Sequence, residues 1–316
     1  MKHIKVWIVI IILEILAIFG LLILISTMRS HSKALPFEID QSLRMSYDLD
    51  LADKTEENYW QFVNQRFILI NDDEGILQWV KIDNEFGRND YEFENALTED
   101  EYFRYYSEDG VVTSSVGIDV SKYQGNIDWS QVKAAGVDFA FIRLGFRGYG
   151  NGKIVLDSTY AQNMDGAINN GIHTGVYFYS QAVSYEEGVE EARFVLQNVR
   201  GYAFDLPIVL DTEDAEDDSA RTAGLTVEQR TDACLGFLET IRDAGYPVMF
   251  YANLRWIALS LDITRLHGYD IWFAQYADVP KLPYRYQIWQ YSKDGYVPGI
   301  SKPVDLNIGF DHYGIP

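Results

Sequence analysis

From residue 116 onward, short apolar segments alternate with longer amphipathic ones, and this alternation constrains the fold more than any other sequence feature. The apolar segments are predicted strands: 137–144, 175–179, 208–210, 248–251, 271–274 and 287–291. The amphipathic segments are predicted helices: 160–170, 185–199 and 227–244. Strands that alternate with helices indicate βα units. We therefore predict an α/β fold over residues 116–316, a TIM-like β/α barrel with its chemistry at the carboxyl ends of the strands.

Two carboxylates lie one residue apart at the end of one predicted strand. Asp211 and Glu213 follow the apolar run 207–210. Residues i and i+2 of a strand point the same way, so both acids should project side by side, about 6 to 7 Å apart along the backbone. Such a pair is suited to acid chemistry on an acetal. The alternative is an acidic turn, because further acids follow at 214–218; a calcium loop is disfavoured, since the EF-hand glycine and terminal glutamate are missing.

The first 36 residues contain an apolar run long enough to cross a membrane. Residues 6–27 are almost continuously apolar and are interrupted only by Glu14. A hydrocarbon core of about 30 Å needs about 20 such residues, and no small-residue cleavage site follows. We therefore predict a signal anchor at 6–27, a cytoplasmic N-terminus at 1–5 and a stalk at 28–36. Positive charges flank the run on both sides, so they leave the orientation open.

Residues 37–115 differ in composition from the barrel region and are rich in Asp and Glu. The segments 67–70 and 76–80 flank an acidic, glycine-containing turn and predict a hairpin. A capping box at 98–101 predicts a short helix at 102–106. With an amphipathic stretch at 56–66, these features indicate a small acidic α+β accessory module. Its acidic face either binds a protein partner or stays solvated, and the sequence assigns it no function.

Composition excludes several classes of function. The formal charge of −21 opposes a sequence-independent grip on nucleic acid, which needs clustered Lys and Arg. Cys234 is the one cysteine and cannot form an internal disulfide; its helical surroundings predict a buried apolar residue. The histidines lack metal-ligand spacing, and we expect no metal or cofactor. The glycine-rich run 145–153 lacks the spacing of a phosphate loop and is predicted to form a loop beside the active-site groove.

Three motifs in order resemble those of the glycoside hydrolase family 25 lysozymes. They are the opening run 117–129, the pair Asp211 and Glu213, and the closing runs 288–292 and 304–307. The resemblance covers residues 116–316. It implies an irregular β/α barrel with a groove at the carboxyl ends of its strands. It also implies an N-acetylmuramidase, which cuts the β-1,4 bond between N-acetylmuramic acid and N-acetylglucosamine in peptidoglycan.

Carried over residue by residue, the resemblance gives four acids: Asp119, Asp211, Glu213 and Asp305. Glu213 is the expected general acid, because a carboxyl group in an apolar, carboxylate-rich site holds its proton more tightly. Asp211 is expected to stay ionised and to assist attack by the substrate's N-acetyl group, with retention of configuration; inverting attack by water is the alternative. Asp119 and Asp305 would hold the acids in place or balance charge. Otherwise, Asp119 is a turn or N-cap acid and Asp305 a structural acid at a strand end.

Aromatic residues near the predicted strand ends are candidate saccharide platforms, although an inward core residue looks the same in sequence. They are Tyr177, Tyr179, Tyr251, Trp272 and Trp289. Gln290 is a candidate for hydrogen bonding to sugar hydroxyl or acetamido groups.

Together these features predict a single-pass protein of the bacterial cell membrane whose catalytic domain faces outward, where peptidoglycan lies. One alternative is a wall-binding scaffold that retains the groove without turnover. Another is a sensor in which the accessory module binds a protein partner.

Overall fold

The computed structural model of the chain describes residue 63 and residues 65–71, 77–215 and 217–313. From Phe67 onward, the chain belongs to one compact unit. The predicted anchor 6–27, the stalk and nearly all of the amphipathic stretch 56–66 lie outside the described residues. Within the described ranges, no helix is both long and apolar enough to cross a bilayer.

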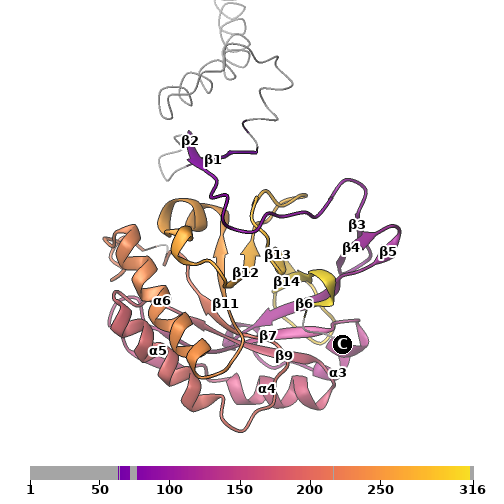
Figure 1. Cartoon of the computed structure of the whole chain (residues 1–316). Helices are drawn as coiled ribbons and strands as arrows, with labels where there is room; N and C mark the ends of the chain where they lie inside the picture. Colours follow the sequence, from indigo (N-terminus) through magenta and orange to yellow (C-terminus); the bar gives the residue numbers. More distant parts are fainter. Residues whose placement is uncertain (1–62, 64, 72–76, 216, 314–316) are drawn as a thin grey trace, which may run out of the picture. The chain divides into compact units, whose positions relative to one another are not determined.

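Eight strands close into a barrel (Figure 1). In the order in which they pair, they are β6 (Ser115–Val120), β7 (Phe139–Arg147), β9 (His173–Tyr179), β10 (Ile208–Asp211), β11 (Val248–Asn253), β12 (Asp270–Ala274), β13 (Ile288–Gly295) and β14 (Val304–Gly309). The ring closes because β14 pairs with β6. A short strand, β8 (Ile154–Leu156), pairs with β7 as a hairpin beside the ring.

The barrel is irregular because β14 runs against its neighbours. The pairs from β6 to β13 are parallel, whereas β14 is antiparallel to both β13 and β6. The connection between β13 and β14, residues 296–303, is too short for a parallel crossover, which needs about a dozen residues or more. The predicted irregular β/α barrel is thus confirmed.

The predicted helices 160–170, 185–199 and 227–244 are confirmed. The α-helices are α3 (Trp129–Ala134), α4 (Tyr160–Asn169), α5 (Tyr185–Asn198) and α6 (Val227–Asp243). Single turns occur at Lys122–Gln124, Trp256–Ser260, Ile263–Arg265 and Phe310–His312. The Ser184 hydroxyl accepts the Glu187 N–H at the start of α5, and Thr226 with Gln229 forms a capping box at the start of α6.

Helices α5 and α6 pack closely because a glycine lies on each facing surface. A Cβ atom on Gly188 of α5 would lie 2.1 Å from the Ala233 carbonyl oxygen. A Cβ atom on Gly236 of α6 would lie 2.1 Å from the Tyr185 carbonyl oxygen. Neither helix therefore has room for a methyl group at this contact.

The two-residue period of the strands separates an inner and an outer core. Phe139, Phe141, Val209, Met249 and Trp272 belong to one buried cluster, and their strand positions all point into the barrel. Ile208 and Leu210 alternate with Val209 and join the larger cluster that includes the helices. Residues of the same parity that follow the inner core, toward the carboxyl end of each strand, therefore face the barrel mouth.

The accessory region contains the predicted hairpin. Strands β1 (Phe67–Asn71) and β2 (Leu77–Lys81) pair antiparallel, so that prediction is confirmed. A second sheet contains β3 (Leu97–Glu99), β4 (Arg104–Glu108) and β5 (Val111–Val112).

The predicted helix at 102–106 is wrong, because most of this segment is strand β4. The Asp100 carboxylate accepts the N–H groups of Tyr102 and Phe103 at 2.9 and 2.8 Å, as a helix cap would. The chain then turns back, and Tyr106 pairs with Leu97. Tyr106 is buried in the aromatic cluster that includes Phe310, and this long-range burial outweighs the local capping signal.

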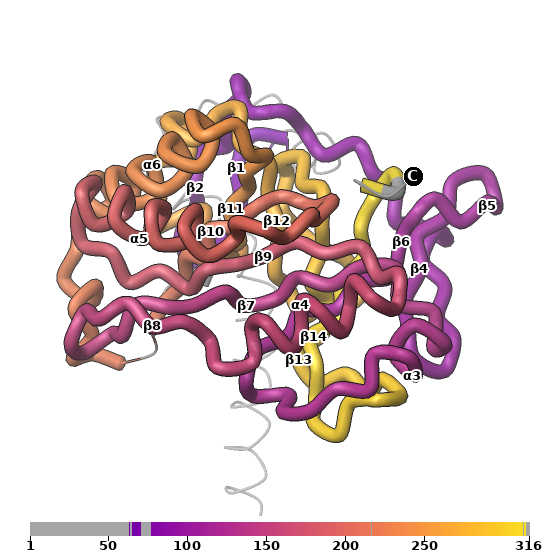
Figure 2. The backbone as a smooth tube through the Cα atoms, turned by 90° about the horizontal axis from the view of Figure 1, so that it is seen from below, coloured from indigo at the N-terminus to yellow at the C-terminus, as the bar shows by residue number. Residues whose placement is uncertain are grey.

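The segment 82–113 packs on the part of the barrel formed by β13, β14 and the residues around them. Tyr91 stacks on Phe310 at 4.1 Å between ring centroids, and Phe93 meets Trp289 edge to face. Helices α5 and α6 lie at one end of the molecule and β4 and β5 at the other (Figure 2). From Phe67 onward, the described part of the accessory region therefore belongs to the barrel's compact unit.

Candidate active site

A groove of about 860 Å³ lies at the barrel mouth. Nine residues predicted from the sequence line it: Asp119, Asp211, Glu213, Asp305, Tyr177, Tyr179, Tyr251, Trp272 and Gln290. They come from the parallel strands toward their carboxyl ends, from the loop after β10 and from the start of the antiparallel strand β14. The expected clustering of these side chains is therefore observed.

The backbone after β10 places Asp211 and Glu213 on the same side. Asp211 ends β10, and the following residue continues the strand's hydrogen bonding, because the Thr212 N–H donates to the Tyr251 carbonyl. The Thr212 hydroxyl faces the helix layer and accepts from the Trp256 indole N–H at 3.0 Å. With Thr212 turned outward, Asp211 and Glu213 both line the groove.

Asp211 is buried at the base of the groove, as Asp119 is. Its Oδ1 atom has no hydrogen-bond partner among the described residues. Burial, and then the nearby Glu213 carboxylate, raise the pKa of Asp211 well above its ordinary value, and Arg143 opposes the shift only in part. The direction of this shift runs against the expectation that Asp211 stays ionised, because burial penalises its charged form.

Asp119 is held by two amide side chains. Its Oδ2 atom accepts from Gln290 Nε2 at 2.9 Å and from Asn307 Nδ2 at 2.8 Å. Burial raises the pKa of Asp119 to about 6, and the two hydrogen bonds restrain that rise. Asp119 lies within β6 and pairs in register with Asp305, so the turn or N-cap alternative does not describe it.

Asp305 faces Asp119 across the antiparallel pair β6–β14. Burial, followed by the Asp119 charge, raises the pKa of Asp305 to about 9. Asp305 therefore carries a proton at neutral pH, and the cluster avoids holding four negative charges.

A hydrogen-bonded array joins Asp119 through Gln290 to two tyrosine hydroxyl groups. Gln290 Oε1 accepts from the hydroxyl groups of Tyr251 and Tyr276, each at 2.9 Å, while Gln290 Nε2 donates to Asp119. The Gln290 amide therefore already has three protein partners. Tyr276 was not predicted, because it lies in a loop after β12 and no strand pattern marks it.

The two tryptophans considered as platforms have different positions. Trp272 lies under the groove, where it stacks on Phe141 at 4.7 Å and donates from its indole nitrogen to Asn307 Oδ1. Trp289 is absent from the groove lining, is fully buried, and donates to the Gln275 carbonyl instead. Both rings belong to the core; Tyr177 and Tyr179 are more exposed at the groove.

Arg143 adds a positive charge that sequence reasoning missed. It lies two positions after Phe141 on β7 and so faces the barrel mouth. Its Nε atom donates to Asp157 at 2.8 Å, and its guanidinium lies 5.0 Å from the Tyr123 ring centroid. A charged residue within the apolar run 139–144 was the available signal.

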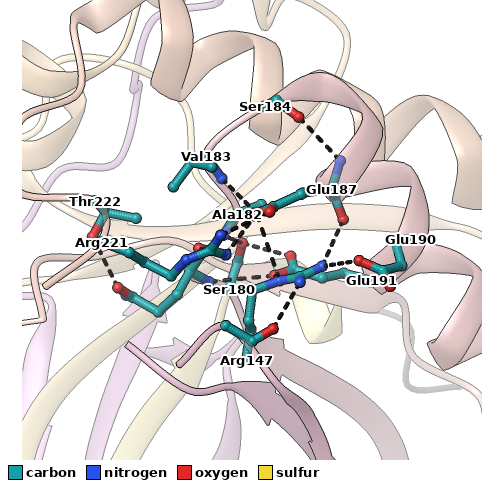
Figure 3. A network of polar contacts seen from close by, with 12 residues as sticks. Arg147, Ser180, Ala182, Val183, Ser184, Glu187, Glu190, Glu191, Arg221 and Thr222 are labelled. Carbon is teal, nitrogen blue, oxygen red and sulfur yellow. Dashed lines mark hydrogen bonds and ion pairs between the residues drawn. The ribbon is translucent and has the colours of Figure 1, made fainter. Parts of the chain in front are cut away.

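An ion network that is buried at Arg147 and Glu191 supports one wall of the groove (Figure 3). Arg147 donates to Glu191 Oε1 at 2.7 Å, and Arg221 makes two hydrogen bonds to Glu187, at 2.6 and 2.7 Å. The Arg221 backbone N–H also donates to the Tyr149 carbonyl, which joins the loop after Glu213 to the β7–β8 hairpin. The network thereby connects the Glu213 loop, the hairpin and helix α5.

The glycine-rich run 145–153 is only partly a loop. Residues 145–147 belong to β7, and residues 148–153 form the turn into β8. Gly148, Tyr149, Gly150 and Asn151 line the groove, so the predicted position beside it is confirmed.

Cys234 and the histidines of the described ranges belong to no group of side chains that could hold a metal ion. Cys234 is buried, as predicted, and burial raises the pKa of its thiol to about 12. Within the described ranges, no group of three or more His, Cys, Asp or Glu side chains has the geometry to hold a metal ion.

Comparison with known proteins places this barrel in a family. The sequence profile of "Glycosyl hydrolases family 25" matches residues 118–300, more than half of the chain. The chain belongs to this family.

Curated relatives and solved structures agree with this assignment. The chain is 29% identical to the autolytic lysozyme of Clostridium acetobutylicum over 60% of its own length and 54% of that protein. It is 31% identical to lysozyme M1 of Streptomyces globisporus, over 62% and 68% of the two chains. The crystal structure of a bacterial lysozyme from Streptomyces coelicolor matches with a TM-score of 0.51 and 30% identity, over 61% and 90%. The chain thus spans about half the length of the first of these relatives.

Proposed function

We propose that this chain is an N-acetylmuramidase that hydrolyses the β-1,4 bond between N-acetylmuramic acid and N-acetylglucosamine in peptidoglycan. The observation that carries the proposal is the set of four carboxyl groups, contributed by β6, β10 with its following loop, and β14, in one groove of a family 25 barrel. The relatives named lysozymes support this reaction class.

Glu213 is the proposed general acid. It lines the groove, is half-buried, and lies two residues past the end of β10. A glycosidic oxygen is a poor leaving group until it is protonated, and a carboxyl group beside the barrel mouth can supply that proton. After the leaving saccharide departs, the resulting carboxylate can remove a proton from the attacking water.

Asp211 is the proposed assistant of the substrate's own N-acetyl group. Its buried Oδ1 atom has no partner among the described residues and can accept a hydrogen bond from an acetamido N–H. Burial makes its charge costly, but a positively charged cyclic intermediate formed from the N-acetyl group would stabilise it. This route retains configuration without a covalent bond to the enzyme; inverting attack by water is the competing mechanism.

Asp119 and Asp305 are proposed to set the charge of the site. The Asn307 and Gln290 amides fix Asp119, and a protonated Asp305 beside it limits repulsion. Tyr177, Tyr179, Tyr251 and Gln290 form the proposed saccharide-binding surface, and Trp272 supports it from beneath. None of these roles requires a cofactor.

The proposed location follows from the substrate and the sequence. Peptidoglycan lies outside the cytoplasmic membrane, so a signal anchor at 6–27 would place residues 116–316 on the extracellular side. A tethered hydrolase reaches only nearby wall. A protein partner for residues 37–115 also remains a proposal, and loss of complex formation without loss of hydrolysis on deleting 37–81 would support it.

The test uses the purified full-length chain on purified peptidoglycan, with reducing ends identified by mass spectrometry. Muramic acid reducing ends are expected from the wild type, with a loss of about 10² to 10⁴-fold in Glu213→Gln. Glu228→Gln, an exposed residue in the first turn of α6, is the matched control. N-acetylglucosamine reducing ends would contradict the bond assignment, and binding without products would favour the scaffold alternative.

A further inference from the structure

We propose that Arg104, which lies outside the family-matched region, is a positioning residue for the saccharide-binding groove and acts through Tyr276. This inference rests on the proposed function for its substrate. It assigns the accessory strand β4 a direct effect on how the barrel binds glycan.

Arg104 is fixed by contacts on several sides. Its backbone N–H donates to the Tyr291 hydroxyl at 3.0 Å. Its guanidinium donates to Glu99 Oε1 at 2.6 Å and lies 5.4 and 5.1 Å from the ring centroids of Trp289 and Tyr291. Only 16% of the side chain is exposed. The guanidinium is therefore a rigid donor rather than a mobile surface charge.

The rigid guanidinium holds the loop that carries Tyr276. Arg104 Nη1 donates to the carbonyl oxygen of Ala277 at 3.0 Å, one residue after Tyr276. The preceding residue is also anchored, because the Gln275 carbonyl accepts from Trp289 Nε1 and the Gln275 N–H donates to the Gln290 carbonyl. Tyr276 is thus held on both sides, once by the barrel and once by Arg104.

Tyr276 connects this loop to the acid cluster. Its hydroxyl donates to Gln290 Oε1, and Gln290 donates to Asp119. Half of the Tyr276 residue is exposed, so it can contact a ligand while its hydroxyl group is fixed. Movement of the loop would move a groove wall and disturb the amide that restrains Asp119.

The surface beyond Tyr276 is hollowed. A second cavity of about 330 Å³ is lined by Arg104, Tyr276, Ala277, Lys293 and their neighbours. Tyr276 and Lys293 also line the main groove, so the two hollows adjoin at these residues. A polymeric glycan that leaves the groove on this side crosses Tyr276 and reaches Arg104's neighbourhood, a surface that the family 25 barrel alone would not complete.

A double-mutant cycle tests the inference, with soluble peptidoglycan strands as substrate and the full-length chain throughout. Arg104→Ala should raise KM on the order of tenfold and leave kcat within about twofold, because one charge-assisted hydrogen bond and its loop order are lost. In a Tyr276→Ala background, the same change should alter KM by less than about twofold. Arg104→Lys, which keeps the charge but lacks the planar fork, is the milder second variant.

Arg265→Ala is the control, since Arg265 makes a surface ion pair with Asp232 away from the groove. An Arg104→Ala effect that persists fully in the Tyr276→Ala background, or a fall in kcat at unchanged KM, would overturn the inference. If the wild type released no muramic acid ends, the proposed function would fail. The same cycle read as the Kd for glycan strands would then still test the role of Arg104.

Discussion

Asp305 lies directly opposite Asp119 in the antiparallel pair β6–β14, so a half-buried and a buried carboxyl group share one end of the barrel. The antiparallel course of β14 produces this pairing. Burial raises the pKa of Asp119 to about 6 and that of Asp305 to about 9. The raised pKa means that Asp305 holds its proton more tightly than an ordinary aspartate does.

The first prediction concerns pH-dependent stability. The pKa of Asp305 rises on folding from an ordinary value near 3.8 to about 9, so the folded chain binds this proton more tightly. The associated stability is complete below about pH 4 and is lost as pH rises toward 9. Asp305→Asn should therefore raise the free energy of unfolding at pH 8, by roughly 1 to 3 kcal/mol, and flatten its pH dependence.

Thermal unfolding between pH 5 and about 9 measures this effect. Asp218→Asn, at an exposed position, is the control. An Asp305→Asn variant with the same pH slope as the wild type would show that Asp305 is ionised in the folded protein.

The second prediction concerns the proposed substrate assistance by Asp211. Asp211→Asn should lower kcat on the order of 10²-fold, because the neutral amide cannot stabilise positive charge in the reacting N-acetyl group. A trifluoroacetamido substrate, whose carbonyl is a weaker nucleophile, should react slowly with the wild type. Proton NMR of the first-formed product should show retention of configuration. An inverted product would exclude the substrate-assisted route.

The third prediction concerns the ion network behind the Glu213 loop. Arg221→Ala removes the paired hydrogen bonds to Glu187 and should cost roughly 1 to 2 kcal/mol of stability, a value kept small because both side chains are partly exposed. It should also lower kcat, since the loop after Glu213 loses its attachment to α5. Steady-state kinetics and thermal unfolding report the two effects separately.

Arg265→Ala, which breaks an exposed ion pair with Asp232, should leave both quantities nearly unchanged. A normal kcat in Arg221→Ala at a temperature well below its Tm would mean that the network stabilises the fold without placing Glu213.

The fourth prediction concerns the contact between α5 and α6. Gly188→Ala should destabilise the protein by roughly 1 to 3 kcal/mol, because the new methyl group meets the Ala233 carbonyl oxygen. Gly224→Ala is the matched control, since a Cβ atom there meets nothing within 4 Å. Denaturant unfolding compares the two variants, and equal midpoints would show that the helices can separate at little cost.

Sequence reasoning succeeded where a signal is local and periodic. The strand period placed Asp211 and Glu213 on one side, and the same period explains why Trp272 and Gln290 face inward while Trp289 faces outward. The period alone did not show which tryptophan faces the groove, because the inward-facing positions of a strand are known only when its register is known. The helix predicted at 102–106 was wrong because a long-range contact, the burial of Tyr106 against Phe310, outweighed the local capping signal.

The sequence by itself determined the βα alternation, the paired acids and the family to which the chain belongs, because each is carried by residues close together in the chain. Only the tertiary structure decided the proton held by Asp305, the raised pKa of Asp211 and the link from Arg104 to Tyr276. Those properties depend on burial and on contacts between residues far apart in sequence. Burial sets the cost of a charge, and closure of the barrel brings the distant partners together.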